Sequence, residues 1–204
     1  MRSLAQSLRY APAAGVLSFF LLYAVSAVLY PGGSQGDLRQ PGFSLFHNYF
    51  CDLLRPIAYN GQPNTGRGVG LVAMALVAPT LALFWHFVVR LFPTQRLFVM
   101  TTRMGGYVSA LATLLLVTPF HDSAVEIGGA FGLIAFFSTL MALPREKHGV
   151  LFAAGLAAAI VSSVCLFIWR SGLGLPALAG LQKLAFALFL TWVCAASLAA
   201  ARAE

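Results

Sequence analysis

The chain has 204 residues, of which 59% are apolar and 9% are charged, and its mean hydropathy is +0.82. A soluble domain carries roughly 25% charged residues, so this composition excludes a soluble globular domain, a disordered chain and a disulfide scaffold. The net charge of +7 comes from no Lys/Arg-rich block. Instead, basic residues stand at the ends of apolar runs, where they contact lipid headgroups. The sequence predicts a membrane protein with no nucleic-acid partner.

The apolar residues number about 120 and a spanning helix needs about 20, so the chain has room for six spans and for no separate soluble domain. The first run, 13–30, is too long for the apolar core of a signal peptide, and we expect a retained signal-anchor helix. The fold class is therefore all-α, a single six-span membrane domain over residues 1–204. The further spans are expected at 68–91, 97–120, 124–143, 149–169 and 175–200.

Residues 43–58, between the first and second spans, are too few and too polar to cross a membrane. Asn48, Asp52 and Arg55 follow the i, i+4, i+7 spacing of one helical face, and apolar residues occupy the other. This pattern predicts a short helix at the membrane interface. A loop rich in Asn, Gly and Pro follows over 59–66 and leads into the second span.

Gly128 and Gly132 stand four residues apart in the expected span 124–143. Small residues at this spacing allow a neighbouring helix to approach closely. We therefore expect close helix packing along this face.

The distribution of basic residues predicts the orientation, because loops on the cytoplasmic side carry an excess of Lys and Arg. With both termini cytoplasmic, eight basic residues fall inside and five outside. The inner set is Arg2, Arg9, Arg90, Arg96, Arg103, Arg145, Lys147 and Arg202, and the outer set is Arg39, Arg55, Arg67, Arg170 and Lys183. We expect a bacterial inner-membrane protein with cytoplasmic N- and C-termini.

Most polar residues that are costly in a membrane gather on the outer side in this orientation. His121, Asp122 and Glu126 surround the start of the fourth span, and His47 lies in the outer segment. Together they predict a site for zinc or another divalent metal. The alternative is a helix cap, in which Asp122 or Ser123 caps the span and Glu126 lies in its first turn.

If the outer cluster is catalytic, Asp52, His121 and Asp122 are the candidates for metal ligation or general acid–base chemistry. Further polar side chains would hold an anionic headgroup, and these are Asn48, Arg55, Asn60, Asn64, Arg67 and Lys183. The alternatives are a solvated interfacial helix for 43–58 and a Lys183 side chain that extends outward to the interface. Haem bound between facing histidines is a further alternative.

The chain resembles the FRAG/DRAM-like group of six-span membrane proteins and its bacterial relatives. The resemblance is carried by the segments 48–54 (NYFCDLL), 60–64 (NGQPN) and 180–183 (GLQK), by His121 and by Trp192. It implies a six-helix fold with polar motifs on the outer face. A weaker resemblance, through Asp52, His121 and Asp122, is to the alkaline-ceramidase-type membrane hydrolases, although the late H-x-x-x-H pair of those enzymes is absent here.

Three functions follow from these observations. The first is a membrane-embedded, metal-assisted hydrolase of a lipid or lipid-linked substrate. The second is a non-catalytic module that binds a membrane lipid or a partner membrane protein, and association with a second copy of the chain stays open. The third is a small transporter, which the few polar residues at mid-depth of the spans disfavour.

Overall fold

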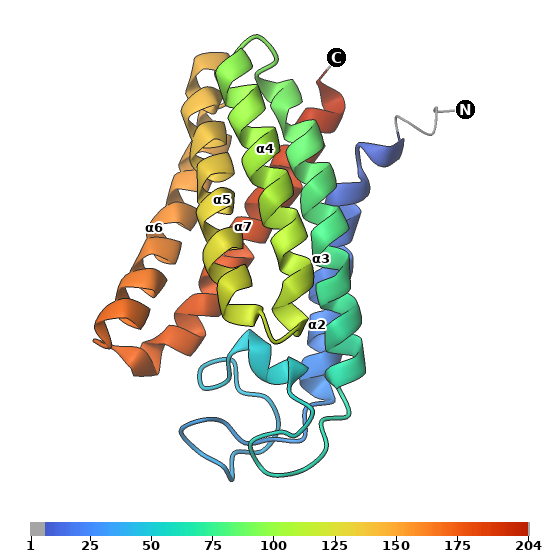
Figure 1. Cartoon of the computed structure of the whole chain (residues 1–204), viewed down its shortest axis with the longest axis vertical. Helices are drawn as coiled ribbons and strands as arrows, with labels where there is room; N and C mark the ends of the chain where they lie inside the picture. Colours follow the sequence, from blue (N-terminus) through green and yellow to red (C-terminus); the bar gives the residue numbers. More distant parts are fainter. Residues whose placement is uncertain (1–6, 204) are drawn as a thin grey trace.

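The computed structural model describes residues 7–203, and at positions 116, 117, 121 and 122 it describes the backbone alone. The described chain is helical, and its only β pairings are two isolated bridges. Six long helices run up and down along one axis (Figure 1). They are α2 (Ala11–Val28), α3 (Arg67–Val88), α4 (Arg96–Ala112), α5 (His121–Ala142), α6 (Gly149–Ser171) and α7 (Leu175–Arg202).

Three short 3-10 helices extend the ends of α3, α4 and α5. They are η2 (Val89–Leu91), η3 (Thr113–Val117) and η4 (Leu143–Glu146). The predicted spans therefore match the observed helices to within a few residues, apart from 97–120, which divides into α4 and η3.

Five helical segments are long and apolar enough to cross a membrane, and they include α2, α3 and α5–α7. The all-α prediction is confirmed, and the five segments have the length and apolar character expected of a membrane protein. Helix α4, which has 17 residues and carries Arg96 and Arg103, is not among the five. Length and apolar character therefore support five spans in the described chain, and not the predicted six.

Residues 29–66 form a folded connection between α2 and α3, which we call the cap, at one end of the helices (Figure 1). We call the opposite end, where α2 begins and α7 ends, the terminal end. The helix expected over 43–58 is reduced to a five-residue 3-10 helix, η1 (Phe50–Leu54). The reason is that Asn48 and Asp52 accept hydrogen bonds from nearby backbone N–H groups and so compete with helical hydrogen bonding.

Helices α4 and α5 approach closely through small residues. A Cβ atom at Gly128 would lie 2.9 Å from Ala112 Cβ, and one at Gly132 would lie 2.8 Å from Ser109 Oγ. On the facing helix, a Cβ atom at Gly105 would lie 2.8 Å from the backbone oxygen of Phe131. The close packing predicted from the Gly128–Gly132 spacing is confirmed.

The core is an aromatic cluster around Trp192 of α7, which is almost fully buried. Its ring centroid lies 5.5 Å from that of Phe84 and 4.9 Å from that of Phe136, in edge-to-face geometry that suits aromatic quadrupoles. The indole Nε1 donates a hydrogen bond to the Leu151 carbonyl at 2.9 Å. Trp192 therefore joins α3, α5 and α6 to α7.

Candidate functional site

Asn48 is the centre of the cap and is completely buried. Its Nδ2 donates to the Gly33 carbonyl at 2.9 Å and to Asp52 Oδ2 at 3.1 Å. Its Oδ1 accepts from Gln40 Nε2 and from the Ser44 backbone N–H, both at 2.9 Å. All four hydrogen-bonding positions of the amide are used, so the side chain has no capacity left for a ligand.

Asp52 is also buried, with 3% of its surface exposed. Its Oδ2 accepts hydrogen bonds from Asn48 and from the Tyr49 backbone N–H, the latter at 2.9 Å. Burial raises the pKa of this carboxyl above its ordinary value, because the desolvation cost exceeds the lowering by these hydrogen bonds and by the charges of Arg55 and Lys183. The carboxyl group is hydrogen-bonded within the cap and does not face solvent.

Helix α7 holds the cap through two neighbouring side chains. Lys183 Nζ donates to the Asn48 carbonyl, and to the Ala179 carbonyl on its own helix at 2.9 Å. The same ammonium lies 5.4 Å from the ring centroids of both Phe43 and Phe50, a cation–π geometry. Gln182 Oε1 accepts from the Phe50 backbone N–H at 3.1 Å. These contacts link segments more than 130 residues apart.

The other predicted headgroup ligands of the cap contact the cap itself. Asn60 donates to the Pro31 carbonyl at 2.9 Å, and Asn64 donates to the carbonyls of Leu53 and Arg55 at 3.0 Å each. Arg67 Nε donates to the Leu54 carbonyl at 3.0 Å.

The guanidinium of Arg55 lies 4.4 Å from the Tyr59 ring centroid. Both Arg55 and Arg67 remain exposed, so each retains donors that could reach a ligand.

A cavity of about 1160 Å³ lies beside this network, between the cap and the adjoining parts of the helices. Its lining is mainly apolar and comes from the cap, from α2, α3 and α5, and from the ends of α6 and α7 nearest the cap. The volume is slightly above that of typical ligand pockets, which is about 300–1,000 Å³. Its polar and thiol-bearing lining residues are Tyr23, Gln35, His47, Tyr49, Cys51, Glu126, Cys165 and Gln182.

The predicted metal ligands are described only in part. His47 and Glu126 are exposed and both line the cavity, and the His47 ring forms a 3.0 Å hydrogen bond with Ser44. The side chains of His121 and Asp122 lie outside the described part of the structure. Among the side chains that it does describe, no group of three His, Cys, Asp or Glu is placed to hold a metal ion.

Two features of the site were missed from the sequence. The first is the part of the cavity that is lined by Leu166, Trp169 and Phe186. These residues lie in segments that the sequence shows only to be apolar, so no local pattern identifies them as lining a cavity. The backbone partner of Asn48 is Gly33, whose φ of +80° suits glycine. The Gly32-Gly33 pair marks a turn in the sequence but not its contact with Asn48.

Comparison with family models, with curated proteins and with solved structures finds no match to the chain. The function is therefore inferred from the site itself.

Proposed function

We propose that this integral membrane protein binds the apolar chain of a membrane lipid in the cap cavity. The observation that carries the proposal is the 1160 Å³ cavity with a mainly apolar lining beside a folded polar cap. Sites for small molecules are usually concave, mostly apolar and equipped with a few polar groups that orient the ligand. Gln182, Tyr49 and His47 are available as such groups, whereas Asn48 and Asp52 are engaged within the cap.

We also propose that α4 and η3 form a sixth span. Seventeen α-helical residues at about 1.5 Å and five 3-10 residues at about 2.0 Å give about 36 Å, enough for a hydrocarbon core of about 30 Å. The excess of basic residues supports a terminal end that faces the cytoplasm. In a bacterial inner membrane the cap cavity would then lie at the outer leaflet.

A binding experiment in nanodiscs tests the lipid proposal. A spin-labelled or fluorescent diacyl lipid should bind the wild-type chain, and Leu166→Trp should weaken binding because the indole occupies cavity volume. Ile160→Trp is the matched control, since Ile160 lies on the same helix, is similarly exposed, and does not line the cavity. Equal binding by the two variants would contradict the proposal.

The exposed thiol of Cys51 lines the same cavity and provides a second measurement. A bound lipid chain should slow alkylation of Cys51 by N-ethylmaleimide, and removal of the lipid should restore the rate. An alkylation rate that is independent of lipid would place the lipid elsewhere.

A second candidate is hydrolysis of the bound lipid. It is favoured by one observation, which is that two predicted metal ligands, His47 and Glu126, line the cavity. About one zinc ion per purified chain, together with release of fatty acid that Glu126→Gln abolishes, would support the hydrolase. Lipid binding with neither result would leave the non-catalytic module.

A further inference from the structure

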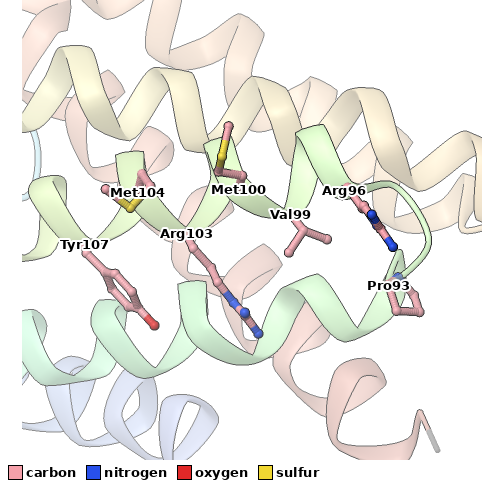
Figure 2. A pocket seen from close by; sticks show the side chains of 7 residues that line it. All are labelled: Pro93, Arg96, Val99, Met100, Arg103, Met104 and Tyr107. Carbon is pink, nitrogen blue, oxygen red and sulfur yellow. The ribbon is translucent and has the colours of Figure 1, made fainter.

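A second pocket, of about 350 Å³, lies near the terminal end on α4, far along the chain from the cap. Its lining is Pro93, Arg96, Val99, Met100, Arg103, Met104 and Tyr107. Figure 2 shows Arg103 and Tyr107 extending from α4 towards the neighbouring helix, with Arg96 beside Pro93 where α4 begins. The pocket thus combines two guanidinium groups with an apolar surface.

The two arginines are not neutralised by the protein. Within residues 7–203, neither Arg96 nor Arg103 forms a hydrogen bond or an ion pair with another described side chain, and Arg103 Nε is fully buried without a partner. The acidic residue of the neighbouring η4, Glu146, accepts hydrogen bonds from Thr94 and Gln95 instead. A buried guanidinium N–H without an acceptor has lost its hydrogen bonds to water, which costs free energy. An anion bound in this pocket would reduce this desolvation cost.

The spacing of the charges fits a lipid headgroup. Arg96 and Arg103 are seven residues apart, about 10 Å along the helix at 1.5 Å per residue, and fall on the same face. The Tyr107 hydroxyl, held by a 2.8 Å hydrogen bond to His86 Nδ1, is one turn further on. Guanidinium groups bind phosphate oxygens in a bidentate manner, and the apolar lining between them suits an acyl chain.

We propose that this pocket binds an anionic glycerophospholipid from the leaflet at the terminal end. Arg96 and Arg103 would hold the phosphodiester, and Met100 and Met104 would contact the first part of an acyl chain. The site is separate from the cap cavity and does not depend on the function proposed for it.

The test is lipid binding to the full chain in detergent, measured by native mass spectrometry with short-chain phosphatidylglycerol and phosphatidylcholine. Phosphatidylglycerol should bind several-fold more tightly than phosphatidylcholine. Arg103→Gln and Arg96→Gln should each weaken its binding about tenfold, the effect of losing one charged hydrogen bond. Arg202→Gln removes the same charge from an exposed position at the terminal end outside the pocket, and should change binding less than twofold.

Several results would overturn the proposal. The first is wild-type affinity for phosphatidylglycerol in both pocket variants. The second is an equal loss of affinity in Arg202→Gln, which would indicate non-specific attraction of the lipid to positive charge. The third is displacement of the lipid by millimolar inorganic phosphate, which would indicate a site for a soluble anion. If Arg103→Gln fails to fold, Arg96→Gln and Arg103→Lys decide, because the lysine keeps the charge and loses the bidentate geometry.

Discussion

Replacing Asn48 by alanine should open the cap while leaving the helices folded. The substitution removes four hydrogen bonds of 2.9–3.1 Å, three to neutral partners and one to the Asp52 carboxylate. At about 1 kcal/mol for each neutral bond and about 2 kcal/mol for the charged one, the loss is about 5 kcal/mol. Because the partners stay in the cap, the cost falls on cap opening rather than on the aromatic core around Trp192.

Hydrogen exchange of the cap amides measures this opening directly. A loss of about 5 kcal/mol corresponds to exchange that is about 10³- to 10⁴-fold faster for the Gly33 and Ser34 amides, which are paired within the cap. The control is His47→Ala, which removes an exposed side chain from the position directly before Asn48. It should change the free energy of cap opening by no more than about 0.5 kcal/mol. Equal exchange in the two variants would refute the assignment of Asn48 as the residue that holds the cap.

Three further predictions follow from single contacts. Burial raises the pKa of Asp52 in the folded cap, so the folded cap binds more protons than the open cap between the ordinary carboxyl pKa and the raised value. The stability of the cap should therefore fall as pH rises across that interval. Asp52→Asn should remove this pH dependence of the hydrogen exchange of cap amides. Gly105→Ala should destabilise the chain by about 1–3 kcal/mol in thermal unfolding, because its Cβ would meet the backbone of Phe131, whereas Gly129→Ala, with open space around it, should not. Partial desolvation and the nearby charge of Asp52 raise the pKa of the accessible Cys51 thiol, so its alkylation rate should continue to increase above pH 9, and a plateau below that pH would contradict the assignment.

The sequence predicted the helices because their signal is local. Apolar runs of about 20 residues interrupted by Pro, Gly and charged residues are unambiguous, and the Gly128–Gly132 spacing indicated a close helix contact that the structure confirms. Each of these features depends on residues within one or two turns of one another. Nothing about the rest of the chain is needed to interpret them.

The cap could not be predicted in the same way, because its contacts join distant segments. Periodicity over 43–58 indicated a helix, yet Asn48, one of the polar residues that produced this pattern, binds the backbone of Gly33 and Ser44. Lys183 reaches the carbonyl of Asn48 from α7, 135 residues away. Asn48 and Asp52, which the sequence indicated as ligand-binding and catalytic residues, are thus hydrogen-bonded inside the cap, and a single sequence does not separate a buried structural amide from a ligand-binding one.

Helix α4 carries the proposed second lipid site and is also the helix whose membrane-spanning role is a proposal. It has 17 residues, carries Arg96 and Arg103, and is not among the helices that qualify as spans, yet it packs tightly between α3 and α5, both of which qualify. An unpaired guanidinium seven residues inside a span is costly, unless its charge is compensated near the interface. An anionic headgroup in the α4 pocket supplies this compensation, so the lipid that we propose there would also stabilise α4 as the sixth span. If Arg103→Gln both weakened lipid binding and increased stability in lipid-free detergent, the cost of the unpaired charge and its compensation by the lipid would be separated in one variant.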